Sequence, residues 1–351
     1  MPLVPLYGHE ALQARLAALA DQGALPASVL LQGPPGIGKQ RLALWLGQRL
    51  LCESANGPCG SCSQCRLTAE LQHPDLRWFF PRERITGDPD GDEVDEAYRS
   101  EIQERVAAHG LYTRPEGSTG IYKYVASLIT RLASLSPSLA RRKVFVFGDA
   151  ERMVPQEANP ETANAILKLL EEPPADTTFI LTSSEPGSLL PTIRSRVVSF
   201  RVPALPESTV QRFIDDPLTK AVLPAGSKAD LVRLAGGAPG ALIGAVDRSV
   251  AVDRARQLLT ASESGREAML RAALSSASSK ARGSFSDVLD ALTVLLHERA
   301  QEAAQRGDEP TARRAVRAIP DVESAKRLAE GNVNPQLITA QLVHALSGRL
   351  V

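Results

Sequence analysis

The chain has 351 residues, 43% of them hydrophobic and 23% charged, which is an ordinary globular composition and excludes collagen-like, mucin-like and wholly disordered proteins. The 40 basic and 40 acidic residues cancel, so a broadly basic protein that coats nucleic acid is not expected. The sequence has no apolar run of membrane-spanning length and no signal-peptide pattern at its start, so we expect a cytoplasmic protein.

The front of the chain has the pattern of a parallel α/β sheet. Its predicted elements, in chain order, are an amphipathic helix around Leu12 and Leu19, a strand at 29–31, a helix at 41–51, a strand at 144–147, a helix at 163–172 and a strand at 178–181. Strands that alternate with helices predict a parallel sheet with helices on its faces.

The first motif is a phosphate-binding loop between a predicted strand and a predicted helix. Gly33, Gly36, Gly38 and Lys39 match G-x-x-x-x-G-K, in which the glycines let backbone N–H groups face phosphate and the lysine reaches the terminal phosphates. The next residue is Gln40, where a Mg²⁺-binding Ser or Thr is usual. The pattern predicts a degenerate nucleotide site and leaves ATP binding open.

A second departure lies at the end of the strand at 144–147. An ATPase needs two adjacent carboxylates there, one for the metal and one to polarise water, but the chain has Gly148 and Asp149. Asp149 fits a helix cap as well as a catalytic role. Gln40 and Gly148, taken as independent changes, predict a site that is built like an ATPase and cannot hydrolyse ATP.

All the cysteines fall in one short segment: Cys52, Cys59, Cys62 and Cys65, with spacing C-x6-C-x2-C-x2-C. Four thiolates this close can hold one tetrahedral Zn²⁺, and since the protein fills every position the site would be structural. An iron–sulfur cluster and a C-x-x-C redox pair are the alternatives.

Residues 82–105 carry nine acidic side chains against four arginines. Because a charge-rich segment with few apolar residues cannot offset its ordering entropy, we expect a solvated or partly disordered insertion. Further on, 205–247 reads as a small helical unit, with a capping box at Ser227 and Asp230. Beyond about residue 250 the chain is mostly helical, with an apolar stripe over 285–296.

Five segments, in this order, resemble the clamp-loader branch of the AAA+ proteins, and within it the delta-prime family of bacterial DNA polymerase III. They are Lys143–Met153, Asn164–Pro174, Leu189–Arg196, Gly236–Leu242 and Val333–Ile338. The resemblance implies an α/β P-loop AAA+ domain at 1–203, with a zinc module at about 52–65 and an acidic insertion at about 81–120. A helical lid at 204–248 and an all-α collar oligomerisation domain at 249–351 would follow.

The resemblance also implies a function. Arg196 lies in the family's arginine-finger segment, where Val197 replaces a Cys, and the lid lacks the nucleotide-sensing arginine that catalytic subunits carry near Pro239. This favours a noncatalytic stator over the gamma/tau motor. Such a stator works in a five-subunit ring with delta and gamma/tau subunits, which loads a sliding clamp onto primer–template DNA for the DNA polymerase holoenzyme. The alternatives are an active gamma/tau-type or other AAA+ ATPase, and a zinc-stabilised P-loop protein without a replication role.

Overall fold

The computed structural model describes residues 3–111, 119–153, 161–243, 245–275, 282–330 and 333–350. Within these ranges the side chains of 161–165, 245–250, 282–284, 286–287, 330 and 350 are not described, so Asn164 and Ala165 of the clamp-loader motif lie outside the described side chains. The chain forms two compact units that divide at residues 243 and 244. The predicted three-part division into AAA+ domain, lid and collar stays a prediction.

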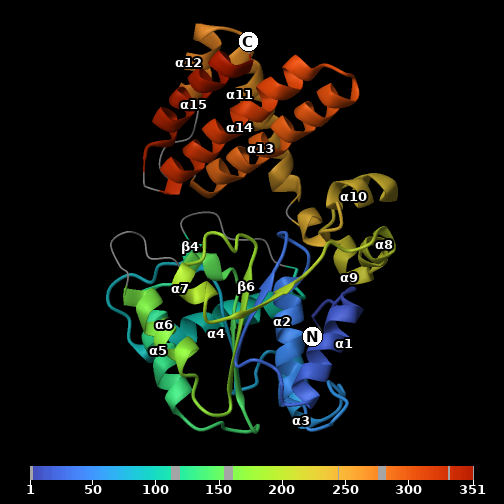
Figure 1. Ribbon diagram of the computed structural model, residues 1–351, viewed down its shortest axis with the longest axis vertical. Coiled ribbons are helices and arrows are strands. Elements are labelled where there is room, and N and C mark those ends of the chain that lie inside the picture. The colour runs from blue at the N-terminus through green and yellow to red at the C-terminus, as the bar shows by residue number, and fades with distance from the viewer. Residues whose placement is uncertain are drawn as a thin grey trace. The chain divides into compact units, whose positions relative to one another are not determined.

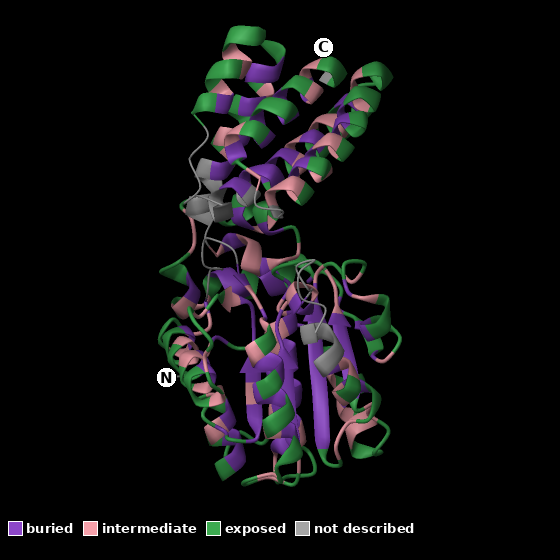
Figure 2. Ribbon diagram, turned by 90° about the vertical axis from the view of Figure 1, so that its left-hand side faces the viewer, coloured by how far each residue is buried: buried purple, intermediate pink, exposed green. Residues whose placement is uncertain are grey.

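The first unit is built on a five-stranded sheet of order β2-β5-β6-β1-β7, in which every pairing is parallel. Its strands are β1 (Ser28–Gln32), β2 (Leu76–Phe79), β5 (Lys143–Phe147), β6 (Thr177–Ser183) and β7 (Val198–Arg201). Strands β5 and β6 are buried along their whole length, as expected for parallel strands covered on both faces (Figure 2).

Helices cover both faces of this sheet (Figure 1). Helices α1 (Glu10–Asp21) and α2 (Lys39–Leu51) lie on one side, and α5 (Lys123–Ser134) and α6 (Glu161–Glu171) lie on the other. The path from β1 to β2 runs one way across the sheet and the path from β2 through β5 to β6 runs back, so right-handed crossovers place their helices on opposite faces. This is the predicted AAA+-like α/β fold.

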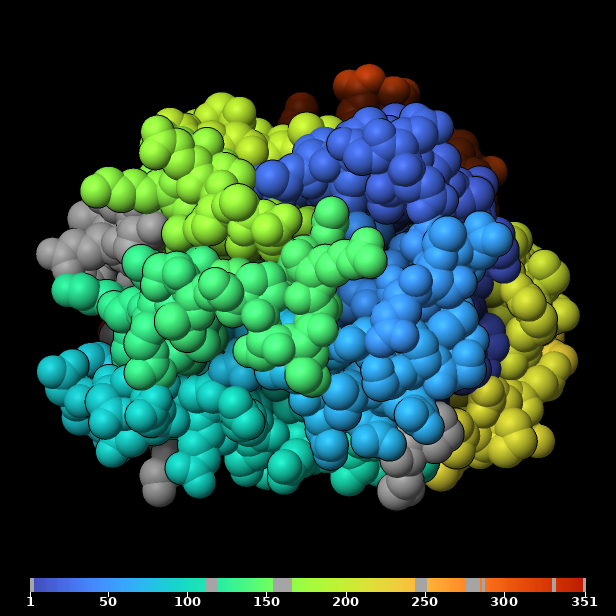
Figure 3. All heavy atoms as spheres, turned by 90° about the horizontal axis from the view of Figure 1, so that it is seen from below, coloured from blue at the N-terminus to red at the C-terminus, as the bar shows by residue number. Residues whose placement is uncertain are grey.

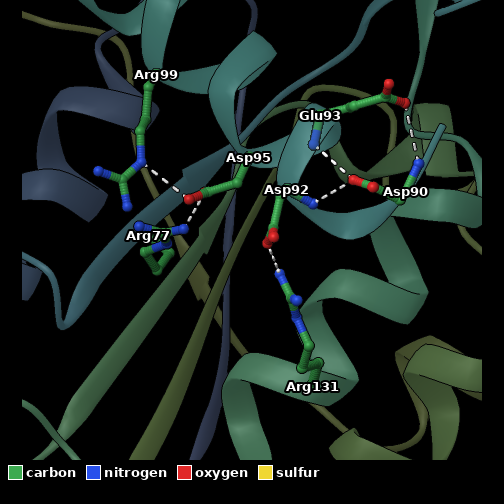
Figure 4. Close-up of polar contacts among 7 residues, drawn as sticks. All are labelled: Arg77, Asp90, Asp92, Glu93, Asp95, Arg99 and Arg131. Atoms are coloured by element: carbon green, nitrogen blue, oxygen red, sulfur yellow. Dashed lines mark hydrogen bonds and ion pairs between the residues drawn. The ribbon is translucent and has the colours of Figure 1, made fainter.

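The acidic segment is folded, contrary to the sequence expectation. Helix α4 (Gly91–Ala107) begins with a capping box, in which Asp90 Oδ1 accepts from the N–H groups of Asp92 at 2.8 Å and Glu93 at 2.9 Å. Glu93 Oε2 in turn accepts from the N–H of Asp90 at 3.2 Å (Figure 4). Val94 and Tyr98 are buried on the inner side of the helix. The expectation of a solvated or partly disordered insertion is wrong for 91–107.

Arginines from neighbouring elements balance the acidic face of α4 (Figure 4). Arg77 of β2 forms an ion pair with Asp95, which also accepts from Arg99 Nε at 2.9 Å. Arg131 of α5 donates to Asp92 Oδ1 at 2.7 Å. Composition within the segment could not reveal these partners because Arg77 and Arg131 lie outside it.

The predicted lid residues form helices α8 (Glu207–Asp215), α9 (Pro217–Lys220) and α10 (Lys228–Ala235) and the 3₁₀ turn η2 (Pro239–Leu242), within the first unit. Ser227 caps α10, since its Oγ accepts from the N–H of Asp230 at 3.2 Å. This is half of the predicted capping box, because the Asp230 carboxylate accepts from the Ser227 hydroxyl at 2.5 Å. Gly236 ends α10 with a φ of +53°, a left-handed conformation that favours glycine.

The second unit is helical in its described residues. Its helices are α11 (Ala245–Glu263), α12 (Arg266–Leu274), α13 (Arg282–Gln305), α14 (Glu309–Glu330) and α15 (Pro335–Leu350). The predicted apolar stripe lies on α13, where Leu289, Leu292 and Leu296 are fully buried in the core of this unit. Over the described part of the chain, no helix combines the length and apolar character that a membrane span requires.

Candidate functional site

The phosphate loop connects β1 to α2, as predicted. Gly36 and Gly38 have φ values of +76° and +93°, and Gly38 is the N-terminal cap of α2. A Cβ on Gly33 would lie 2.2 Å from the carbonyl oxygen of Val202, so this glycine is required by space. The loop therefore has the backbone that a phosphate site needs, at the start of a helix.

Lys39 is buried and its ammonium group has partners within the protein. Its Nζ donates to Gly33 O at 2.9 Å, to Pro34 O at 2.7 Å and to Ser184 Oγ at 2.8 Å. An ammonium group has three donors, so a nucleotide phosphate would have to exchange with these contacts. Ser184 follows β6 and was not singled out from the sequence.

The turn η2 touches the phosphate loop through backbone atoms. The N–H of Gly240 donates to Gly36 O at 2.8 Å, and a Cβ on Gly240 would lie only 2.7 Å from the Cα of Gly36. This contact lies next to Pro239, where the resemblance places the missing lid arginine. Two glycines thus bring the turn η2 against the loop at a point where no side chain fits.

The two unusual positions of the motif are in direct contact. Gly148 follows β5 and faces the side chain of Gln40, whose Oε1 lies 2.6 Å from the place of a Cβ on Gly148. The sequence analysis treated these as independent departures, whereas the structure places the two residues side by side.

A second carboxylate near the loop was missed. Glu151 lies in the 3₁₀ turn η1 (Ala150–Met153), and its Oε1 accepts from the N–H of Ser184 at 3.2 Å. Its Oε2 is buried without a hydrogen-bond partner among the described atoms. Burial raises the pKa of Glu151 above its ordinary value, and the nearby Asp149 raises it further. Sequence reasoning did not single out Glu151 because it lies past the strand-end position that the motif specifies.

The cysteine segment brings all four sulfur atoms together. Their Sγ atoms lie within 4.8 Å of one another, with 3.9 Å between Cys52 and Cys62 and 4.0 Å between Cys59 and Cys65. Zn–S bonds of about 2.3 Å in a tetrahedron place the sulfurs about 3.8 Å apart. The four side chains therefore fit one zinc ion as a complete ligand set.

Local hydrogen bonds organise the cysteine cluster. Cys62 is the N-terminal cap of α3 (Ser63–Ala69) and accepts from the N–H of Cys65 at 3.4 Å, while Cys59 accepts from the N–H of Cys62 at 3.4 Å. The Ser61 hydroxyl and nearby N–H groups lower the pKa of Cys59 to about 5, whereas burial raises the pKa of Cys65. Figure 3 shows the light-blue surface of this segment beside green residues of a later segment. Gln64 Nε2 donates to Leu139 O at 3.5 Å.

Arg196 lies between the short helix α7 (Pro191–Arg194) and the edge strand β7. Its guanidinium forms an ion pair with Glu171, the last residue of α6, and Nη1 donates to Thr192 O at 2.8 Å. The Arg196 side chain is 30% exposed and that of Glu171 is 43% exposed. Glu171 is thus a partner of Arg196 that the sequence did not indicate.

Comparison with known proteins identifies the family. A family model described as DNA polymerase III, delta subunit, matches residues 8–206, more than half of the chain. The delta-prime subunit of DNA polymerase III from Pseudomonas aeruginosa is 31% identical over 229 residues, which cover 65% of this chain and 58% of that protein. The chain belongs to the delta-prime family. The Escherichia coli K12 delta-prime subunit is 30% identical over 65% of this chain and 57% of its own length.

The alignments with these delta-prime relatives span less than two thirds of each relative. The gamma/tau subunit of Mycobacterium tuberculosis is more distant, at 28% identity over 72% of this chain and 39% of that protein. Among solved structures, a gamma subunit-related protein from Thermotoga maritima aligns over 97% of this chain and 99% of its own, with 18% identity and a TM-score of 0.41.

In this delta-prime family member the predicted site residues form separate groups. Gly33, Gly36, Gly38 and Lys39 form the phosphate loop, and Gln40 follows them at the start of α2. Cys52 follows the other end of α2, a helix of 13 residues and about 20 Å. A zinc ion there would stabilise its own segment and take no part in phosphate chemistry.

Proposed function

We propose that this chain is a noncatalytic subunit of a bacterial DNA polymerase III clamp loader. The observation that carries the proposal is that Gln40 and Gly148, which lie against each other, replace the hydroxyl and the carboxylate that hold Mg²⁺ in phosphate-loop ATPases. The chain that carries these replacements belongs to the delta-prime family. A ring subunit at the end of an arc needs to complete its neighbour's site and does not need a hydrolytic site of its own.

In this proposal Arg196 is an arginine finger that reaches the γ-phosphate bound by a neighbouring subunit. A planar guanidinium at that place stabilises the charge that develops during phosphoryl transfer. Its position beside the edge strand β7 supports the proposal, because an edge strand has no partner on its outer side within the described sheet. Its partner Glu171 is partly exposed, so a phosphate can replace Glu171 as the partner of the Arg196 guanidinium.

The proposed partners are the delta and gamma/tau subunits in a five-subunit ring, with the sliding clamp and primer–template DNA engaged through the complex in the cytoplasm. Large apolar side chains on the second unit support such an assembly: Leu270 and Leu274 of α12 are 62% and 65% exposed, and Leu337 of α15 is 65% exposed. The four cysteines would hold a structural zinc ion.

The test is clamp- and DNA-stimulated ATP hydrolysis by the reconstituted complex carrying Arg196→Ala. We expect assembly to be retained and hydrolysis to fall, because one motor site loses its finger. An arginine finger contributes roughly 10³–10⁵-fold at its own site. The loss in the whole complex should be smaller, since other motor sites take their fingers from other subunits.

Glu171→Gln is the matched control. It breaks the same ion pair but keeps the guanidinium, so a finger role predicts that only Arg196→Ala lowers hydrolysis. Arg196→Lys should rescue poorly, because a point charge cannot reproduce the planar fork. Equal losses for Arg196→Ala and Glu171→Gln would assign the effect to the ion pair, and an unchanged rate for Arg196→Ala in an assembled complex would make Arg196 an ordinary surface arginine.

A further inference from the structure

The space above Gly148 is filled by the side chain of Gln40. A Cβ on Gly148 would lie 2.6 Å from Oε1, 2.7 Å from Cδ and 2.8 Å from Nε2 of Gln40, all closer than real Cβ contacts. The φ of Gly148 lies outside the left-handed region, so its backbone does not require glycine. A side chain at position 148 would therefore have to displace the carboxamide of Gln40.

These two residues hold the positions that bind the metal in phosphate-loop ATPases. There, a hydroxyl after the loop lysine and a carboxylate at the strand end hold Mg²⁺ beside the phosphates. Mg²⁺ needs near-octahedral oxygen ligands at 2.0–2.1 Å and gives up its waters reluctantly. In this chain both ligand groups are absent, and the carboxamide of one residue lies where the side chain of the other would begin.

We propose that Gln40 and Gly148 act as one coupled pair that keeps divalent cations out of the phosphate loop. The proposal rests on the noncatalytic function above and adds a cause: the Gln40 carboxamide occupies the space where a metal-binding side chain at 148 would begin, in addition to the missing ligands. Restoring either residue alone therefore does not rebuild the metal position. A carboxylate at 148 needs the room that a smaller residue at 40 leaves, and a hydroxyl at 40 needs the carboxylate.

The surrounding charges add to this coupling. Asp149 and Glu151 follow the same strand, Glu151 within the turn η1, and the Glu151 side chain is half-buried. The ammonium group of Lys39 already donates hydrogen bonds to Gly33 O, Pro34 O and Ser184 Oγ. Gly148→Asp would add a third carboxylate beside Asp149 and Glu151. Without a bound cation this charge would be uncompensated, and the new side chain would press on the carboxamide of Gln40.

The experiment is a double-mutant cycle on the full chain with Gln40→Thr, Gly148→Asp and both changes. Binding of a fluorescent ADP analogue is measured with and without Mg²⁺, together with the midpoint of thermal unfolding. We expect only the double variant to gain Mg²⁺-dependent nucleotide affinity, by tenfold or more. We also expect Gly148→Asp alone to lower the unfolding midpoint by several degrees, and Gln40→Thr to restore much of that loss.

Gly148→Ala is the second variant, since it adds the clashing Cβ without a charge. It should lower the unfolding midpoint in the wild-type background and not in the Gln40→Thr background. Additive effects of Gly148→Ala and Gln40→Thr, or full Mg²⁺ dependence in Gln40→Thr alone, would overturn the coupling. Rapid ATP hydrolysis by the isolated wild-type chain would instead overturn the noncatalytic function, so the two failures are distinguishable.

Discussion

His73 is a buried imidazole whose two ring nitrogens have defined partners. Nε2 lies 2.5 Å from Gln64 Oε1, and Nδ1 lies 3.0 Å from the backbone N of Asp75. An amide oxygen only accepts and a backbone N–H only donates, so the contacts fit a neutral ring with its proton on Nε2. Protonation of Nδ1 would remove the acceptor for the N–H of Asp75.

The environment of His73 predicts a pH dependence of stability. Burial lowers the pKa of His73 below its ordinary value, and the opposing effect of Asp75 does not cancel this. The unfolded chain binds the proton more readily, so the contribution of His73 is complete above about pH 6.5 and falls as the pH drops below it. As the pH is lowered from 7.5 to 5, the free energy of unfolding should fall more steeply in the wild type than in His73→Gln. Parallel curves for the two proteins would contradict this.

At the level of single residues, the sequence predicts what is local and misses what is distant. Gly33, Gly36, Gly38 and Lys39 were predictable because one strand–loop–helix segment contains them. The contacts of Lys39 with Ser184 and of Arg196 with Glu171 were not, because each joins two elements that only the fold brings together. A motif predicts the chemistry of a residue, whereas its partners depend on sheet order.

Among the helices and strands, too, those with a local sequence pattern were predicted and those that depend on distant partners were missed. Apolar runs predicted β1, β5 and β6, which the sheet buries on both faces. Strand β7 was missed because it lies at the sheet edge, where three of its four residues are exposed. Helix α4 was misjudged because its buried side is small and its charges find partners on β2 and α5.

The cysteine module is an element that should depend on metal. We expect about one zinc per chain, and we expect Cys62→Ser to lower hydrogen-exchange protection in α3 and the preceding loop while the sheet stays protected. The reason is that a structural zinc ion supplies folding free energy to the segment that binds it. Zinc analysis and hydrogen exchange on the same samples check both parts.

Ser54→Ala is the control for this experiment. Ser54 lies in the same loop, and its exposed side chain is not a candidate ligand, so zinc content and protection should not change. A wild-type protein without zinc, or one with an iron chromophore, would contradict the assignment of the metal.

At the scale of the whole molecule, the chain has separate cores in its two compact units. Leu292→Ala should destabilise the second unit by about 2–5 kcal/mol, because Leu292 is fully buried there and its truncation leaves a cavity. Hydrogen exchange should accelerate in α11, α13, α14 and α15 and not in the sheet of the first unit. The control is Val294→Ala on the same helix, where the side chain is 55% exposed. Similar losses for both variants would contradict the core assignment.

The sheet order has a consequence for synthesis on the ribosome. Strand β1 is made early, but both of its neighbours, β6 and β7, are made about 150 residues later, on the order of 10 s at 5–20 residues per second. During that interval the apolar residues Val29, Leu30 and Leu31 lack the strands that bury them in the finished protein. The nascent first unit should therefore need chaperone protection until the ribosome has passed β7. For the same reason, a chain that stops before β6 should aggregate.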